Sequence, residues 1–160
     1  MASEGTTKYY SSIQEKMVAM LLGWEVVSGS GAAACTPGDV INEDWLGECK
    51  THTSPGKKIV FYQSVWKKIC DEAMVKHRNP VLIVDDGSQA PSRTWCLCRL
   101  SAVSGVSDAF MDYSLGRNKN ISAKADDLNK KSVEGIITTE WCGEPILICK
   151  LIKFVDVLKG

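Results

Sequence analysis

Hydrophobic positions recur with two different spacings along this chain, and the spacing predicts its elements. Apolar residues three and four positions apart indicate helices, because they share one face of a 3.6-residue turn. Short runs that alternate or are wholly apolar indicate strands. Helices are therefore expected at residues 7–22, 64–77, 122–132 and 154–158. Strands are expected at residues 24–27, 39–41, 45–52, 58–62, 81–84, 95–100, 136–141 and 145–152.

The first predicted helix carries one acidic residue in an informative place. It begins after Thr6 or Thr7 and ends before Gly23, a typical C-terminal stop. Glu15 lies between a small polar segment and an apolar flank, where a solvated glutamate would more often have charged neighbours. It is either a site residue or an exposed helix residue. The apolar face of this helix is expected to contain Tyr9, Tyr10, Ile13, Met17, Met20 and Leu21.

Two short strands at residues 39–41 and 45–52 indicate a hairpin closed by a polar turn. Asp39 begins the first of these strands. Successive side chains of a strand point to opposite faces. The alternation therefore predicts Glu48, Lys50 and His52 on one face, and Cys49 and Thr51 on the other.

The remaining elements predict a layered architecture. Ser64 is the expected N-cap of the second helix, and Ser122 is the expected cap of the third. A wholly apolar run at residues 81–84 is typical of a buried central strand. The element order indicates an α/β or α+β fold with helices packed on a mixed sheet. Core packing is expected through Val65, Ile69 and Ala73 of the second helix, and through Trp45, Trp66, Trp95 and Trp141.

Composition narrows the class of protein. The chain has 160 residues, of which 44% are hydrophobic and 24% charged, as in an ordinary globular protein of one domain. No apolar run is long enough to span a bilayer and the N-terminus lacks a signal-peptide pattern, so we expect a cytoplasmic protein, of cellular or viral origin. Seven cysteines without a C-x-x-C pair, beside two histidines, predict buried thiols rather than a zinc site.

Charge is balanced over the chain but clustered along it. Nineteen basic and nineteen acidic residues give a formal net charge of zero, which argues against general affinity for nucleic acid. A neutral protein can still present one basic face. Candidate residues for contacts to phosphates are Lys57, Lys58, Arg117 and Lys119, and the alternative is an ordinary solvated surface.

The spacing of acidic residues suggests a chemistry. Hydrolysis of a phosphodiester is helped by a divalent metal that neutralises charge and lowers the pKa of bound water. Magnesium prefers hard oxygen ligands. Asp39 and Glu48 on neighbouring strands can supply them, the backbone carbonyl of Cys49 can add a third, and Glu15 can complete the set. Lys50 shares the face of Glu48 and can orient the water or offset charge in the transition state.

These residues resemble a known family. The helix with Glu15, the segment at residues 24–31, the segment at residues 37–40 and the Glu-Cys-Lys triplet are similar to the PD-(D/E)xK nuclease superfamily. Within it they are most similar to archaeal-type Holliday-junction resolvases and their phage-encoded relatives. The resemblance covers about half of the chain, and the segment after about residue 104 has no clear counterpart.

The resemblance implies a fold, a cofactor and partners. It implies a restriction-endonuclease-like mixed sheet, with a core at about residues 8–100 and an extension at residues 101–160. It also implies a homodimer that makes paired nicks in branched DNA with Mg²⁺, for which Mn²⁺ can substitute. No small-molecule cofactor and no membrane partner are expected.

Site residues follow from the same resemblance. Glu15, Asp39 and Glu48 would be metal ligands together with the Cys49 carbonyl, and Lys50 would be the catalytic lysine. Ser28 or Ser30 would contact substrate near the scissile phosphate. His52 can touch a phosphate or be an ordinary strand histidine. Gln63 matches a glutamine that some relatives use, or is simply the start of a helix.

Three other functions remain open. A nuclease with the same core can act on linear DNA in restriction or repair. A DNA-binding protein can keep the fold without cutting, although the full set of Glu15, Asp39, Glu48 and Lys50 argues against it. Finally, the Glu-Cys-Lys triplet can be an accident in an unrelated α/β protein, because so short a pattern is common.

Overall fold

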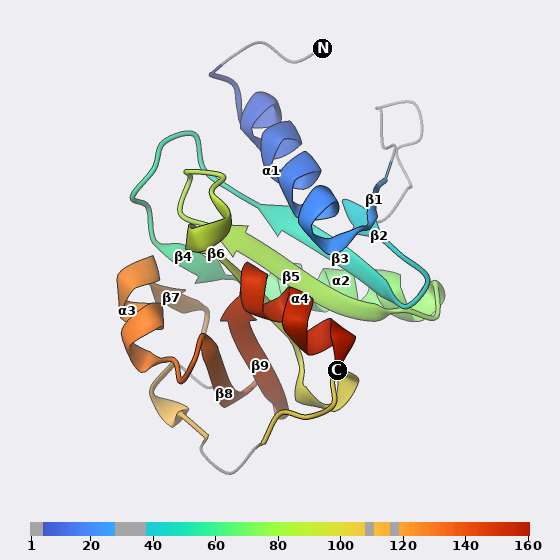
Figure 1. The fold of residues 1–160 in the computed structure, drawn as a ribbon, viewed down its shortest axis with the longest axis vertical. Helices are drawn as coiled ribbons and strands as arrows, with labels where there is room; N and C mark the ends of the chain where they lie inside the picture. The colour runs from blue at the N-terminus through green and yellow to red at the C-terminus, as the bar shows by residue number, and fades with distance from the viewer. Residues whose placement is uncertain (1–4, 28–37, 108–110, 116–118) are drawn as a thin grey trace.

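A seven-stranded mixed sheet forms the centre of the protein (Figure 1). The computed structural model describes residues 5–27, 38–107, 111–115 and 119–160. In spatial order the strands are β1 (Glu25–Val26), β2 (Val40–Ile41), β3 (Trp45–Lys50), β5 (Asn79–Asp85), β6 (Thr94–Arg99), β9 (Glu144–Lys150) and β8 (Ile136–Trp141).

Only one pair of neighbouring strands in this sheet is parallel. β3 and β5 run side by side from the pair Trp45 and Asn79 to the pair Lys50 and Val84, and every other pairing in the sheet is antiparallel. A parallel pair needs a long crossover connection. Here the crossover contains β4 (Ile59–Phe61) and α2 (Gln63–Val75). The C-terminal ends of β3 and β5 consequently lie at the same edge.

Helices cover both faces of the sheet. α1 (Thr7–Leu22) and α4 (Leu151–Lys159) lie on one face, whereas α2 lies behind it (Figure 1). The second face also carries a two-stranded sheet of β4 and β7 (Ile121–Ala123), followed by α3 (Ala125–Lys131). Alternation along β5 supplies both cores, because Val81 and Ile83 pack toward α1 and α4 while Leu82 and Val84 pack toward α2. The expected mixed α/β class is confirmed, and so is the buried central strand.

The bounds of α1 match the prediction, but its buried face does so only in part. Thr6 Oγ1 accepts a hydrogen bond from Tyr9 N at 3.2 Å, and Gly23 ends the helix at a φ of +72°. The expected apolar face is confirmed for Met17, which packs against the core, and is wrong for Met20, Ile13 and Leu21, which are 78%, 38% and 38% exposed. The helix instead buries Gln14, Val18 and Ala19. Burial of the polar Gln14 is possible because its amide has a backbone partner on β3.

Two expected helix caps are also wrong. α2 begins at Gln63 rather than after Ser64, and the Gln63 N–H is satisfied by Asn120 Oδ1 at 2.9 Å. Ser122 does not cap α3, because it lies in β7 opposite Val60. In both cases a partner distant in the sequence replaces the local hydrogen bond that a serine cap would provide.

Core composition agrees with the sequence pattern. All four named tryptophans are buried. The thiols of Cys49, Cys96, Cys98 and Cys149 are buried as well, and the six cysteines that the structure describes are free. The strand expected at residues 145–152 ends at Lys150, where α4 begins, and the strand expected at residues 45–52 also ends early, at Lys50.

Among the helices described here, none combines the length and the apolar character that crossing a membrane requires.

Candidate active site at the ends of β3 and β5

Glu48 and Lys50 lie on one face of β3, near its C-terminal end. Lys50 Nζ is 3.4 Å from Glu48 Oε1, and their side chains are 49% and 12% exposed. Cys49 points to the opposite face, where it joins the core beneath α1. The alternation that the sequence predicts for these three residues is confirmed. A half-exposed ammonium group is thus held beside a largely buried carboxylate.

Asp39 is placed by the antiparallel pairing of β2 with β3. Val40 pairs with Gly47, so continuing the register by one step sets Asp39 opposite Glu48. The Asp39 N–H donates to the Gly47 carbonyl at 2.8 Å, and Asp39 Oδ2 accepts from the Cys49 N–H at 2.8 Å. Its carboxylate therefore satisfies a backbone group of β3 that β2 is too short to pair.

Glu15 reaches the same region from α1. The pKa of Glu15 is raised to about 7, mainly by burial and then by the charges of Asp39 and Glu48, while the charge of Lys50 opposes this rise. Such an influence requires these groups to lie close together. Glu15 comes from α1, Asp39 from the loop before β2, and Glu48 and Lys50 from β3. Together they form one electrostatic cluster, which we call the acidic cluster.

Asp39 and Glu48 are also harder to ionise than free carboxyl groups. Burial is the largest cause that raises the pKa of Asp39, and the hydrogen bond from the Cys49 N–H opposes it. Burial likewise raises the pKa of Glu48, and the Asp39 charge adds to this effect. Nearby positive charge is thus insufficient to offset the desolvation of these carboxylates.

α2 contributes two charged residues that the sequence analysis missed. Lys68 lowers the pKa of both Asp39 and Glu48. It also lies 3.6 Å from Glu72, whose Oε2 accepts from the Gly38 N–H at 3.0 Å. The only sequence signal was the four-residue spacing of Lys68 and Glu72, which places both on one face of a helix. That spacing does not reveal which strand the face covers.

Two buried side chains fix the end of β3. Gln14 Nε2 donates to the Lys50 carbonyl at 2.6 Å, and Asp85 Oδ1 accepts from Thr51 Oγ1 at 2.5 Å. Gln89 Nε2 donates to the same Thr51 hydroxyl at 2.9 Å. Gln14 Oε1 and Asp85 Oδ2 are buried without a hydrogen-bond partner among the described residues. The backbone on either side of Lys50 is thereby anchored from α1 and from β5.

Other residues named by the sequence analysis lie elsewhere or stay undecided. His52 falls beyond the end of β3, where it lies close enough to Asp85 to lower the pKa of that carboxyl. Gln63 is the first residue of α2, and the Lys57 N–H donates to the Asp86 carbonyl at 2.9 Å. Lys58 and Lys119 line a groove beside β7. Ser28, Ser30 and Arg117 lie outside the described residues.

The donor atoms of the acidic cluster suit a hard divalent cation. Within the described residues, no three side chains of His, Cys, Asp or Glu form a group that would hold a metal ion as they stand. Glu15, Asp39 and Glu48 nevertheless present only carboxylate oxygens, the donors that Mg²⁺ prefers. A cation among them would also relieve the repulsion that raises the pKa of Glu15. The residues therefore fit Mg²⁺ by donor type and by charge.

Comparison of the chain with models of protein families, with curated proteins and with solved structures gave no match. The likeness to PD-(D/E)xK nucleases thus depends on the residues of the acidic cluster and their order.

Proposed function

We propose that this protein is a Mg²⁺-dependent endonuclease of the PD-(D/E)xK type that cuts branched DNA, including four-way junctions, by paired nicks from a homodimer. The observation that carries the proposal is the acidic cluster. One carboxylate comes from α1, one from the loop before β2 and one from β3, and their charges affect one another's pKa values. The Lys50 ammonium forms an ion pair with one of them, Glu48. This arrangement has the donor types that metal-dependent phosphodiester hydrolysis needs.

Each residue has a separate part in the proposed reaction. Glu15, Asp39 and Glu48, with the Cys49 carbonyl, would hold Mg²⁺ or Mn²⁺. When bound, the metal would neutralise phosphate charge and lower the pKa of a bound water. Lys50 orients the attacking water and offsets the negative charge on the phosphoryl oxygens in the transition state.

The surroundings keep Lys50 in place for this role. Glu48 forms an ion pair with its ammonium group, and Gln14 holds its backbone carbonyl. Because Lys50 is half-exposed, a phosphate can approach it from solvent. Lys68 on α2 adds positive charge close enough to affect Asp39 and Glu48. Together these groups hold positive charge at the place where negative charge would develop in the transition state.

A cleavage assay with several substrates tests the proposal. Labelled four-way junction, nicked duplex, flap and linear duplex are each incubated with Mg²⁺ or with Ca²⁺. We expect cleavage of branched DNA with Mg²⁺, and loss of cleavage in Asp39→Asn. Lys50→Ala should abolish cutting and leave binding largely intact. The matched control is Lys76→Ala, which changes an exposed lysine at the C-terminal end of α2.

Each other outcome points to a different function. Cutting of linear duplex at a defined sequence would favour a restriction- or repair-type enzyme. Binding without cutting in any metal would favour a protein that keeps the fold without catalysis. An unchanged rate in Lys50→Ala would remove the role given to Lys50.

A further inference from the structure

A groove of about 680 Å³ lies between β7 and α3, and none of its lining residues belongs to the acidic cluster. Among the described residues, five lysines and one acidic residue, Asp127, line it. Its remaining lining residues are small, polar or apolar, and none of them is aromatic. We call this feature the basic groove and define it by Lys58, Lys119, Lys124, Lys130 and Lys131.

The positive charge of the basic groove is largely uncompensated. Five lysines and one aspartate give a local formal charge of +4. No ion pair among the described residues involves any of these five lysines. Lys131 is partly engaged, because its Nζ donates to Ser114 Oγ at 2.8 Å. Since the whole chain is neutral, this groove is a local concentration of positive charge.

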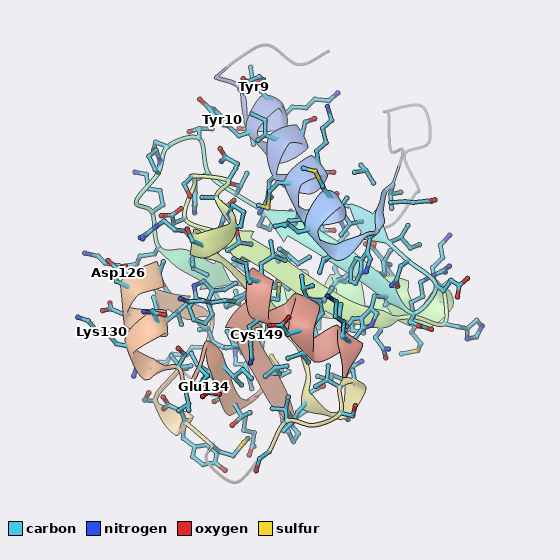
Figure 2. All side chains as sticks on the ribbon, in the orientation of Figure 1. Tyr9, Tyr10, Asp126, Lys130, Glu134 and Cys149 are labelled. Atoms are coloured by element: carbon cyan, nitrogen blue, oxygen red, sulfur yellow. The ribbon has the colours of Figure 1, made fainter. Side chains whose placement is uncertain are left out.

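A rigid framework carries these lysines. β7 pairs with β4 from Ile121 and Phe61 to Ala123 and Ile59, and α3 packs Ala125 and Leu128 into the core. Lys124 and Lys130 are exposed. Figure 2 shows Asp126 and Lys130 on α3, on the side of the helix turned away from the sheet. The charges are thus displayed on elements that the core holds fixed.

Contacts at the end of β5 place the basic groove next to the candidate active site. Arg93 forms ion pairs with Asp86, directly after β5, and with Asp126 in the first turn of α3. The Lys57 N–H donates to the Asp86 carbonyl, and Lys58 lines the groove. The C-terminal end of β5 lies beside that of β3, where Lys50 sits. The connection from β3 to β4 leads from one region to the other (Figure 1).

We propose that the basic groove binds the phosphate backbone of a duplex DNA arm that extends from the candidate active site. This inference rests on the proposed nuclease function and names a second contact for the same substrate. A lysine ammonium group binds phosphate as a point charge. It lacks the planar guanidinium group with which arginine makes paired hydrogen bonds to bases. None of the described residues that line the groove is aromatic, which disfavours stacking of single-stranded bases on them. Binding in the groove should therefore be independent of sequence and sensitive to salt.

A salt series with charge variants tests the proposal. The double variant Lys124→Ala/Lys130→Ala removes two groove charges, and Lys76→Ala/Lys159→Ala removes two exposed charges on α2 and α4 as a matched control. Affinity for a labelled four-way junction is measured in Ca²⁺ by fluorescence anisotropy. For two lost phosphate contacts the slope of log K against log salt should become shallower by about 1.8 in the groove variant. The control should keep the wild-type slope.

Charge reversal and a second nucleic acid sharpen the result. Lys124→Glu/Lys130→Glu should weaken binding more than the alanine pair does, while circular dichroism and Tm remain those of the wild type. A groove variant with the wild-type slope and affinity would overturn the proposal. Equal or tighter binding of duplex RNA of the same sequence would also overturn it, because the groove would then not be a DNA site.

The experiments distinguish failure of the proposed DNA binding by the groove from failure of the proposed nuclease function. If the wild type cuts junctions but the groove variant binds like the control, the groove proposal fails and the proposed function stands. If the wild type cuts no DNA but the groove variant shows the shallower slope, DNA binding by the groove stands and the nuclease fails. A wild type that binds no DNA overturns both.

Discussion

The ionisation of Glu15 responds strongly to its surroundings. This residue lies on a helix, half-buried, and two other carboxylates act on it. Because the pKa of Glu15 is about 7, its carboxyl group is protonated in part of the molecules and ionised in the others near neutral pH. The same side chain can thus be neutral in the free protein and ionised when a cation is present. If the acidic cluster binds the proposed Mg²⁺, the titration of Glu15 would report that binding.

The stability of the free protein should fall as the pH rises through the window that Glu15 titrates in. Between the ordinary value of 4.5 and about 7 the folded state binds more protons than the unfolded state. Stability therefore decreases as pH increases there. Glu15→Gln removes the charge, so its Tm should exceed that of the wild type by a few degrees at about pH 8 and by much less at about pH 4. Thermal melts without divalent metal measure this difference.

Exposed acids elsewhere provide the control for that experiment. Glu43→Gln changes an exposed glutamate in the turn between β2 and β3. Its Tm difference from the wild type should not change across the same pH range. A Glu15→Gln difference that is independent of pH would contradict the raised pKa.

Mg²⁺ binding should release protons near neutral pH. A carboxyl must be ionised to coordinate a metal, so binding to Glu15 displaces its proton. The affinity for Mg²⁺ should therefore rise between about pH 6 and pH 8. Calorimetry at about pH 7 in two buffers of different ionisation enthalpy gives the number of protons released. Glu15→Gln should bind more weakly and release fewer. Heats that do not depend on the buffer would argue against a role for Glu15 as a ligand.

At the scale of elements, the end of β3 is organised by its neighbours rather than by its own sequence. Gln14 of α1 holds the Lys50 carbonyl, and Asp85 of β5 holds the Thr51 hydroxyl. A strand end anchored from two sides keeps its side chains in a fixed register. The position of the Lys50 ammonium thus depends on a helix and on a strand that are distant in sequence.

Replacing Gln14 tests this dependence. Gln14→Ala removes a buried hydrogen bond and leaves the Lys50 carbonyl unsatisfied, so it should destabilise the protein by about 1–3 kcal/mol. Urea denaturation measures the change. Met20→Ala, at a 78% exposed position on the same helix, should alter stability by no more than about 0.5 kcal/mol. Amide exchange at Thr51 and His52 should accelerate in Gln14→Ala. Unaltered exchange there would show that the anchor does not position the strand end.

Sequence patterns predicted the positions of helices and strands better than they predicted which side of each element is buried. The caps of α1, the hairpin of β8 and β9 and the buried run of β5 are visible locally, because each depends on residues close in the chain. The buried side of α1 was not visible. Apolar residues lie on more than one side of this helix, and the choice between sides depends on the sheet beneath it and on the partner of Gln14.

The candidate site was predictable in part for the same reason. Glu48 and Lys50 share a face through strand alternation, and Asp39 follows from the hairpin register. Lys68 and Asp85 were missed, because their approach to β3 depends on the crossover through α2 and on the parallel pairing with β5. A pairing between distant segments has no local signature in one sequence.

For the whole molecule, the first helix and the last helix pack into one core. Phe154 of α4 makes edge contacts with Trp24 after α1 and with Trp45 of β3, at centroid distances of 6.3 and 5.4 Å. Cys49 belongs to the same buried cluster, directly behind Glu48 and Lys50. The C-terminal helix therefore supports the layer on which the acidic cluster is built.

Truncating Phe154 should destabilise the protein strongly. Phe154→Ala leaves a cavity among buried aromatic side chains, and we expect a loss of about 3–5 kcal/mol. Ile152→Ala removes an apolar side chain from the same helix at a 54% exposed position, and should change stability by no more than about 0.5 kcal/mol. Urea unfolding monitored by tryptophan fluorescence compares the two. Equal small effects would mean that α4 is not part of the main core.

Asp39 also has a consequence for solubility. Its carboxylate accepts the Cys49 N–H beyond the last residue pair of β2 and β3, in place of a longer neighbouring strand. Asp39→Asn retains an oxygen that can accept this bond, whereas Asp39→Ala leaves the donor open. Unpaired strand edges template association between chains. Light scattering on heating should therefore reveal aggregates in the alanine variant at temperatures where the asparagine variant stays monodisperse, so that one carboxylate would serve both the proposed chemistry and the colloidal behaviour of the protein.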